Sequence, residues 1–259
     1  MQDSVLYIIV FIFGLIVGSF LNVCIFRIPR GKSIIMPSSH CPSCNTPINI
    51  YDNIPILSYI ILGRRCRTCG AKISARYPAV EAANALFYIA LIWRFGIGWH
   101  TFFYFMFASA LIVITFIDID FQIIPDTITL PGIVLGLAAG AFVFPDPFLR
   151  WSLLGYKGSV IGAVTGFLSF YAVAVLSRGG MGGGDIKMMT MVGAIMGWKS
   201  VLLTTFLGSF LGSIWGISLM IFKGKGRKTK IPFGPFLAAG TMITLFSGQE
   251  ILHWYLRIR

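Results

Sequence analysis

Long apolar runs separated by short polar segments recur along the whole chain. A helix needs about 20 apolar residues to cross the roughly 30 Å hydrocarbon core of a bilayer, and eight runs come near that length. They cover residues 5–26, 79–95, 101–117, 127–144, 158–177, 186–198, 201–222 and 236–256. The sixth run is short, so we expect it to be tilted, broken or joined to the seventh. The pattern predicts an all-α polytopic membrane protein with about eight transmembrane helices.

The composition supports this prediction and excludes a water-soluble globule or a disordered chain. Of the 259 residues, 56% are hydrophobic and only 12% are charged, whereas an average soluble domain has roughly 25% charged residues. The 23 Phe, 9 Tyr and 6 Trp suit lipid-facing and interfacial surfaces, and disordered segments are poor in aromatic residues.

The basic residues gather in three polar segments, and this distribution predicts the topology. Residues 27–78, 178–187 and 223–230 hold 15 of the 21 Lys and Arg. Cytoplasmic loops carry the excess of basic residues, and eight spans place all three segments on one side. We therefore expect cytoplasmic loops and two periplasmic termini. We also expect the first run to be a retained helix, because no basic residue precedes it.

The formal net charge of +12 comes mainly from the Lys and Arg of these three segments. Anionic lipid headgroups attract juxtamembrane Lys and Arg, at about 1 kcal/mol per charge. The lipid bilayer is therefore the expected partner of the basic residues, and no nucleic-acid partner is expected.

The first basic segment carries two CxxC pairs that are 21 residues apart, Cys41 with Cys44 and Cys66 with Cys69. Two such pairs can place four thiolates tetrahedrally around Zn²⁺. Two disulfides are the alternative, but the cytoplasm is reducing, and a thioredoxin-like redox site needs only one pair. Because a four-cysteine site leaves no open position for water, we expect a structural zinc ion that folds a cytoplasmic loop module.

Acidic residues in or beside membrane spans are costly and therefore suggest function. Five of the nine acids have such positions: Glu81, Asp118, Asp120, Asp126 and Asp185. With eight spans, Asp118 ends the third span and Asp185 begins the sixth at the same face, so their carboxylates can meet. Two close carboxylates share a proton, so one can act as base towards water while the other protonates the scissile peptide group. The pair thus suggests peptide hydrolysis.

Simpler interpretations of these acids stay open. Asp126 follows Pro125 and is more easily read as a helix N-cap than as a catalyst, and Asp185 could also be a cap. Asp120 lies two residues from Asp118, so a helix would turn it to the other side, towards solvent. Glu81 is either a first-turn acid favoured by the helix dipole or a functional group.

A glycine run, Gly182, Gly183 and Gly184, directly precedes Asp185. Glycines leave backbone N–H and C=O groups uncovered, so an extended peptide could pair with them. The run could equally be a flexible loop. If the substrate carries a basic segment, Asp120 and Asp126 could attract it.

Together these motifs resemble the bacterial type IV prepilin peptidases, a GxGD aspartyl protease family of bifunctional leader peptidases and N-methyltransferases. The resemblance rests on Gly18-Ser19-Phe20-Leu21-Asn22-Val23, Arg27-Ile28-Pro29, the two cysteine pairs, Arg76-Tyr77-Pro78-Ala79-Val80-Glu81, Ile124-Pro125-Asp126 and Gly182-Gly183-Gly184-Asp185. It implies that Asp118 and Asp185 are the catalytic aspartates, that prepilins or pseudopilins are cleaved on the cytoplasmic side after a Gly, and that the enzyme lies in the bacterial inner membrane.

The resemblance also implies a second reaction, methylation of the new N-terminal amine with S-adenosylmethionine. No GxGxxG joins a strand to a helix, so a Rossmann-type donor site is not expected. The candidate methyl-donor residues are Glu81, Arg27 and Asn22. We therefore expect residues 1–100, with the first two spans and the zinc loop 27–78, to form the methyltransferase part. Residues 101–259 would form a six-span peptidase domain.

Two other classes of protein compete with this interpretation. A proton-coupled transporter would use intramembrane acids and glycine-broken helices, but no clear internal repeat supports it. A lipid-headgroup transferase would hold Mg²⁺ on clustered aspartates, and its activity would depend on that metal.

Overall fold

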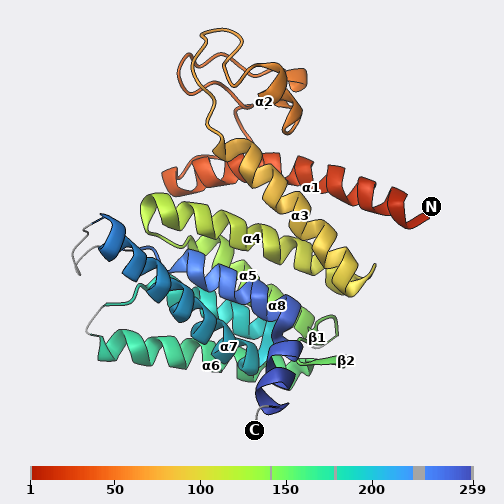
Figure 1. Ribbon diagram of the computed structural model, residues 1–259, viewed down its shortest axis with the longest axis vertical. Coiled ribbons are helices and arrows are strands. Elements are labelled where there is room, and N and C mark those ends of the chain that lie inside the picture. The colour runs from red at the N-terminus through yellow and green to blue at the C-terminus, as the bar shows by residue number, and fades with distance from the viewer. Residues whose placement is uncertain (1, 141, 178–179, 224–230, 258–259) are drawn as a thin grey trace. The chain divides into compact units, whose positions relative to one another are not determined.

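The computed structural model describes residues 2–140, 142–177, 180–223 and 231–257, and helices dominate it (Figure 1). Two compact units divide the chain, residues 1–113 and residues 114–259. Helix α4 contributes its first part to one unit and its last turns to the other. Arg178 and the basic run from Lys225 to Lys230 lie outside the described residues.

The long helices match the apolar runs of the sequence in order. They are α1 (Gln2–Arg27), α3 (Arg76–Phe95), α4 (Trp99–Phe121), α5 (Asp126–Gly140), α6 (Gly155–Leu176), α7 (Gly183–Lys223) and α8 (Gly234–Arg257). Helix α7 contains both the sixth and the seventh expected spans. Gly197, with φ 79° and ψ 172°, breaks the helix between them. The expectation that the sixth span is joined to the seventh or broken is therefore confirmed.

Four of these helical stretches are long and apolar enough to cross a membrane, Ser4–Arg30, Trp99–Phe121, Gly155–Leu176 and Gly183–Phe222. The last has 40 residues, about twice what one crossing needs. The break at Gly197 leaves 14 residues before it and 25 after it, so the second part is long enough to cross alone and the first part is shorter than a full crossing. The chain is thus an all-α membrane protein, and eight is an approximate number of spans.

Small elements complete the described chain. In the polar segment after α1 lie two 3-10 turns, η1 (Ile28–Arg30) and η2 (Ile50–Asn53), and the short helix α2 (Leu57–Ile61). Strands β1 (Pro145–Asp146) and β2 (Leu149–Leu153) form an antiparallel hairpin between α5 and α6. The sequence analysis did not predict this hairpin. Leu149–Leu153 do alternate between apolar and polar residues, but the strand has only five residues and its partner only two, so the signal is short.

In the first unit, α1 and α3 pack closely through small residues. A Cβ atom on Gly14 would lie 2.6 Å from Cα of Ala85, and one on Gly18 would lie 2.6 Å from Cα of Glu81. This spacing of two glycines four residues apart lets helix backbones approach in a membrane. The Asn84 side chain crosses the interface and donates to the Gly14 carbonyl at 2.8 Å.

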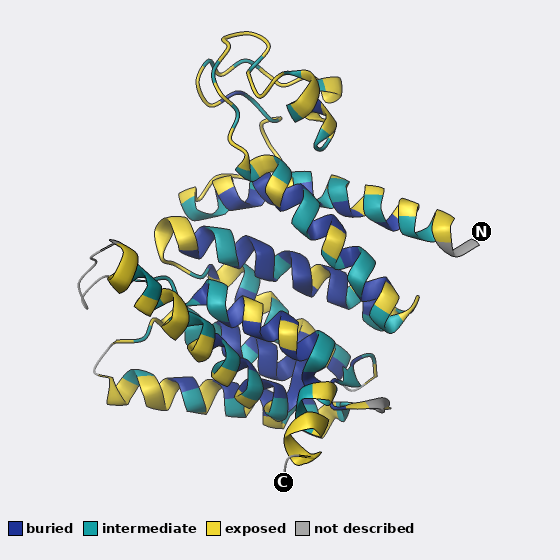
Figure 2. Cartoon of the chain, in the orientation of Figure 1, coloured by how far each residue is buried: buried dark blue, intermediate teal, exposed yellow. Residues whose placement is uncertain are grey.

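In the second unit, α7 is the central helix and packs against α5, α6 and α8. Its first half is deeply buried, with Met188, Met189 and Val192 all 0% exposed, as the dark blue segments of Figure 2 illustrate. A Cβ on Gly162 of α6 would collide with the Gly193 backbone of α7. Outward residues such as Phe206 (67% exposed) and Ile221 (71%) are apolar, as lipid-facing positions require.

Candidate active site and cysteine cluster

Asp118 lies in the last turn of α4 and is buried, with 6% of its surface exposed. Its Oδ2 atom accepts a hydrogen bond of 2.9 Å from the backbone N–H of Gly234. Helix α4 ends just after it, where Gln122 has a positive φ of 54° and its N–H bonds the Asp118 carbonyl at 2.9 Å. The carboxylate therefore has a fixed position inside the second unit.

Asp185 lies in the first turn of α7 and is partly buried. Its backbone N–H bonds the Gly182 carbonyl at 3.2 Å, which closes the turn that starts the helix. Its carboxylate is close enough to Asp118 for the two side chains to interact electrostatically. The structure thus brings together the two aspartates that the sequence singled out, 67 positions apart in the chain.

The glycines before Asp185 have different surroundings. Gly182 and Gly183 are exposed, and a Cβ on Gly183 would meet nothing within 4 Å. Gly184 packs against the segment that follows α4, since a Cβ there would lie 2.7 Å from Cβ of Ile124. Gly184 therefore has a packing reason to be glycine, whereas the first two leave open backbone beside Asp185.

The two remaining acids of this region lie farther out. Asp120 is exposed, as expected. Asp126 is the first residue of α5, and both of its carboxylate oxygens lie 2.7 Å from Nζ of Lys187. Asp126 thus stands at the N-terminal end of α5, where a helix favours an acid, and among the described residues Lys187 is its side-chain partner. The acid ties α5 to the first turns of α7.

Gly234 is a site residue that sequence reasoning missed. It starts α8, and a Cβ atom there would lie only 2.8 Å from Oδ2 of Asp118. Glycine is needed because the backbone N–H must reach the carboxylate without a side chain in between. The available signal was the motif Pro232-Phe233-Gly234-Pro235 directly before an apolar run.

The four cysteines of the first unit form a cluster in which all four sulfur atoms lie within 4.8 Å of one another. The Sγ atoms of Cys41 and Cys69 are 3.9 Å apart. Four thiolates around zinc at a Zn–S distance of about 2.3 Å would be about 3.8 Å apart, so the cluster fits a tetrahedral metal ion with little movement.

The two cysteine pairs lie on matching turns. The N–H of Cys41 bonds the Thr46 carbonyl at 3.0 Å, and the N–H of Cys66 bonds the Ala71 carbonyl at 2.8 Å. Asn45 and Gly70, which follow the second cysteine of each pair, both have positive φ, 55° and 70°. The segment is therefore an internal repeat with an offset of 25 residues, in which two equal turns each offer two sulfurs to one centre.

Local hydrogen bonds favour the thiolate form of one cysteine of this cluster, Cys44. Side-chain and backbone hydrogen bonding with Thr46 lowers the pKa of the Cys44 thiol to about 6. A thiolate, not a thiol, is the metal ligand. His40 bonds the Ser38 carbonyl at 3.2 Å and lies outside the group of four sulfur ligands.

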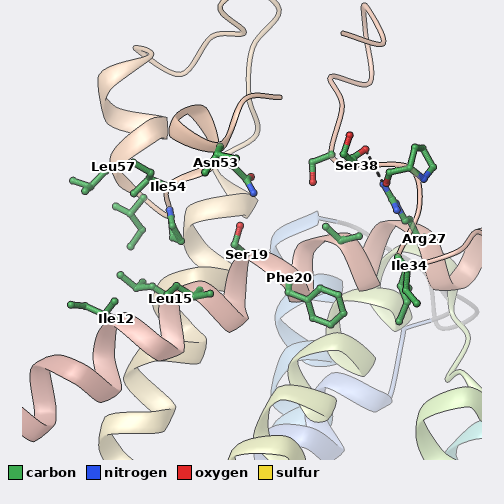
Figure 3. A pocket seen from close by; sticks show the side chains of 18 of the residues that line it. Ile12, Leu15, Ser19, Phe20, Arg27, Ile34, Ser38, Asn53, Ile54 and Leu57 are labelled. Atoms are coloured by element: carbon green, nitrogen blue, oxygen red, sulfur yellow. Dashed lines mark hydrogen bonds between the residues drawn. The ribbon is translucent and has the colours of Figure 1, made fainter. Parts of the chain in front are cut away.

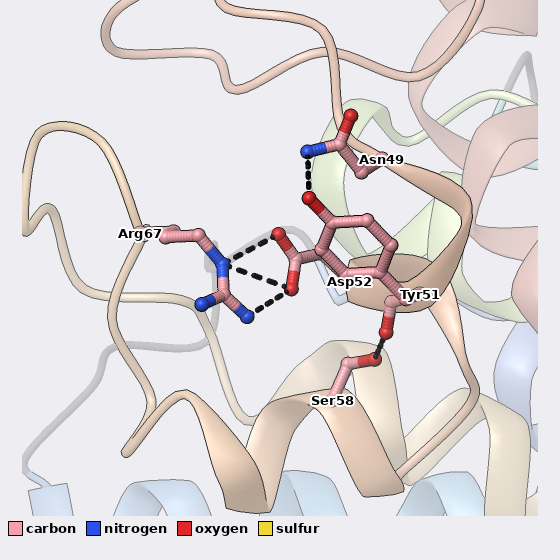
Figure 4. Close-up of polar contacts among 5 residues, drawn as sticks. All are labelled: Asn49, Tyr51, Asp52, Ser58 and Arg67. Atoms are coloured by element: carbon pink, nitrogen blue, oxygen red, sulfur yellow. Dashed lines mark hydrogen bonds and ion pairs between the residues drawn. The ribbon is translucent and has the colours of Figure 1, made fainter.

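An ion pair braces the loop between the two cysteine turns. Arg67 binds both carboxylate oxygens of Asp52, with the shortest contact at 2.6 Å (Figure 4). The hydrogen bond from Arg67 lowers the pKa of Asp52. Tyr51 accepts a bond of 2.7 Å from Asn49, and Ser58 donates to the Tyr51 carbonyl at 3.0 Å.

The three candidate methyl-donor residues all line one cavity of about 420 Å³ below the cysteine turns. Asn22 donates to the Tyr77 carbonyl at 3.1 Å. The Arg27 guanidinium donates to the carbonyls of Ser33 (3.0 Å) and Pro37 (2.7 Å). Glu81, only 7% exposed, accepts the Ile56 N–H at 2.8 Å.

Comparison with known proteins gives two matching family models. Residues 12–95 match the bacterial peptidase A24 N-terminal domain, and residues 105–217 match the type IV leader peptidase family. No solved structure gives a significant match.

Several curated proteins are similar over nearly the whole chain, and they bear the name prepilin leader peptidase/N-methyltransferase. Those from Aeromonas salmonicida, Pseudomonas aeruginosa and Bacillus subtilis are 34%, 35% and 35% identical. The matches cover 96%, 94% and 96% of this chain and 93%, 91% and 98% of those proteins.

Proposed function

Because the chain belongs to the type IV leader peptidase family, we propose that it is an intramembrane aspartyl endopeptidase. It removes the leader from type IV prepilins or pseudopilins and methylates the new N-terminal amine. The observation that carries the proposal is the meeting of Asp118 and Asp185 at the end of α4 and the start of α7.

The two carboxylates divide the work of hydrolysis. The electrostatic interaction between Asp118 and Asp185 disfavours ionisation of both, so in this mechanism the pair works with one proton between them. The ionised member takes a proton from water as the oxygen attacks the scissile carbonyl carbon, while the protonated member gives its proton to the carbonyl oxygen. When the intermediate collapses, the C–N bond breaks, the leaving nitrogen takes the proton that the first carboxylate took from water, and one hydroxyl of the intermediate returns its proton to the other carboxylate.

The leader must be extended to reach this pair, because a helical peptide bond is shielded by its own hydrogen bonding. Gly182 and Gly183, exposed beside Asp185, offer backbone groups with which an extended strand can pair, and Gly184 holds that turn against Ile124. Asp120 attracts the basic leader. Asp126 forms an ion pair with Lys187, so its attraction for a basic leader is weaker than that of a carboxylate without such a pair.

The membrane topology follows from the basic loops. Loops rich in Lys and Arg lie in the cytoplasm, so the cysteine loop and the ends of α4 and α7 near the aspartates face the cytoplasm of a bacterial inner membrane. Both termini are then periplasmic.

The first part of the chain, residues 1–100, serves the methylation. Zn²⁺ held by Cys41, Cys44, Cys66 and Cys69 fixes the loop, since a site with four thiolates is closed. S-adenosylmethionine, which supplies an electrophilic methyl group, binds in the cavity lined by Asn22, Arg27 and Glu81. Residues 101–259 carry the peptidase.

The proposal is tested by incubating the purified protein in liposomes with a prepilin and S-adenosylmethionine, followed by mass spectrometry of the mature N-terminus. We expect leader loss and a mass increase of one methyl group. Leader loss without the added mass would restrict the function to cleavage. An intact prepilin after incubation with folded enzyme would overturn the proposal and favour the transporter class.

A substitution at Gly234 tests how Asp118 is held. The Cβ of Gly234→Ala would lie 2.8 Å from Oδ2 of Asp118, so the carboxylate must move and its bond to the backbone N–H weakens. We expect the cleavage rate to fall by about 10- to 100-fold, because misplacement by about 1 Å has effects of this size. Gly216→Ala is the matched control, since its Cβ would meet its nearest atom at 3.6 Å. Equal rates for the two variants would contradict this role of Gly234.

A further inference from the structure

A second, larger cavity of about 960 Å³ lies in the first unit between α1 and the polar loop (Figure 3). Ile12, Leu15 and Ile16 line it from α1, and Ile34, Ile54 and Leu57 line it from the loop. Several of these side chains are half exposed, among them Ile12 (51%) and Leu57 (55%). The cavity is therefore apolar and open along the lipid-facing side of α1.

This apolar cavity shares a wall with the polar cavity assigned to the methyl donor. Ser19, Arg27, Asn53 and Ile56 line both of them. We call these shared residues the boundary between the two cavities. A ligand that fills the apolar cavity can thus place one end at this boundary, next to the polar cavity.

The boundary is held in a strained conformation. Ile56 has φ 60° and ψ −49°, and the Leu57 N–H bonds the Pro55 carbonyl at 2.6 Å, which is the rare γ-turn with positive φ. Such a conformation is costly for a β-branched residue and tends to occur at functional sites. The Glu81 carboxylate fixes the turn by accepting the Ile56 N–H at 2.8 Å.

Glu81 is also a buried carboxyl group without a matching cation. It accepts the Ile56 N–H, and no Lys or Arg of the described chain is recorded in an ion pair with it. Asp52, another carboxylate on the polar cavity, is neutralised by Arg67. A buried carboxylate is costly unless a cation joins it, so this boundary is complementary to a ligand with a positive charge.

We propose that the apolar cavity is the acceptor site for methylation: it receives the apolar N-terminal residue of the cleaved substrate, and Glu81 holds the new amine at the boundary with the polar cavity. This inference rests on the second reaction of the proposed function. A processed pilin-type N-terminus combines an apolar end with an ammonium group, and the open side lets a membrane helix enter laterally. Before transfer the ammonium group would pass one proton to the Glu81 carboxylate. The nitrogen lone pair would then form the N–C bond as the S–C bond of the donor breaks and its sulfonium leaves as a thioether. An acyl chain would fill the apolar walls but would leave Glu81 without a cation.

The first test measures binding without any methyl donor. The full-length protein in nanodiscs receives a leaderless substrate peptide whose first residue is a photoreactive phenylalanine analogue, and the adducts are mapped by mass spectrometry. We expect adducts in residues 12–20 of α1 and residues 34–57 of the loop. Adducts confined to other helices, or to lipid, would overturn the proposal.

The second test separates the charge of Glu81 from its support of the turn. The Glu81→Gln amide oxygen can still accept the Ile56 N–H, so the cavity keeps its shape while the charge is lost. We expect the free-amine peptide to bind about 10-fold more weakly than to the wild type, and the N-acetylated peptide to bind both proteins equally. If Glu81→Gln weakens the binding of both peptides equally, Glu81 has a purely structural role. If the variant binds both peptides as the wild type does, the assignment of the amine to Glu81 is also contradicted.

The third test blocks the cavity. Leu15→Trp should reduce the methylated fraction about 10-fold or more, because the indole occupies the space of the substrate residue, and peptide binding should fall with it. Ile8→Trp is the matched control, since Ile8 is also on α1 and 59% exposed but lies outside the cavity. Normal peptide binding by folded Leu15→Trp would refute the site. A wild type that binds the peptide but never methylates it would refute the proposed second reaction instead.

Discussion

Asp185→Asn is expected to fold like the wild type and to lose leader cleavage by a factor of about 10³ or more, and Asp118→Asn is expected to do the same. An amide cannot take a proton from water or carry the shared proton of the pair, and loss of one member of a catalytic unit costs effects of this size. In Asp118→Asn the amide oxygen can still accept the Gly234 N–H, so the end of α4 should stay in place. The measurement is the single-turnover cleavage rate of a prepilin in liposomes.

The matched control is Asp146→Asn in the hairpin between α5 and α6. Asp146 also accepts a backbone N–H, from Phe148 at 2.8 Å, and the amide can replace it there. The midpoint of thermal unfolding and the amount of zinc bound per chain should be the same for the three variants and the wild type. Wild-type cleavage by either aspartate variant would remove that residue from the proposed dyad.

Cys41→Ser is expected to abolish stoichiometric zinc binding and to lower the amount of folded protein. Binding to structural zinc sites in small peptides is worth about 10–16 kcal/mol, and without the metal the polar loop has few apolar contacts of its own. Exposed residues such as Ile50 (91%) and Ile61 (75%) show how little apolar surface this segment buries. Zinc per chain, measured by plasma emission, should fall from about one to near zero.

Cys24→Ser is the control for this change. Cys24 is a buried cysteine of α1 and does not belong to the cluster of four, so its replacement should leave zinc unchanged. One zinc ion per chain in Cys41→Ser, with normal folding, would contradict a structural four-cysteine site. Loss of zinc from Cys24→Ser would point to a general folding defect.

Much of the membrane architecture was predictable because burial in lipid is a local property of the sequence. A bilayer imposes a fixed apolar length on every crossing, so six of the eight runs became separate helices and the sixth and seventh runs became the two parts of α7. The cysteine cluster was predictable for a similar reason, since the two CxxC turns are local and their ligand chemistry is specific. The hairpin at residues 145–153 was missed because its strands have only two and five residues, too few for the alternation at Leu149–Leu153 to stand out between long apolar runs.

The aspartate pair was predictable only in part. Sequence and topology placed Asp118 and Asp185 at one face, but the partner of each side chain depended on segments distant in the chain. Gly234 reaches Asp118 across 116 positions, and Lys187 binds Asp126 across 61. Such contacts follow from how α4, α5, α7 and α8 pack, and no local pattern encodes them.

The sequence by itself determined the fold class, the cluster of four cysteines and the two acids. Hydrophobic length, cysteine spacing and the position of an acid beside an apolar run can each be recognised within a short stretch of sequence. Only the tertiary structure decided which backbone N–H holds Asp118, that Asp126 pairs with Lys187, and that Glu81 supports a strained turn at Ile56 between two cavities. These features depend on close approach between helices and loops. Small residues allow it, Gly18 against Glu81 in the first unit, and Gly184 against Ile124 and Gly234 against Asp118 in the second, and the hydrophobic pattern does not encode these contacts.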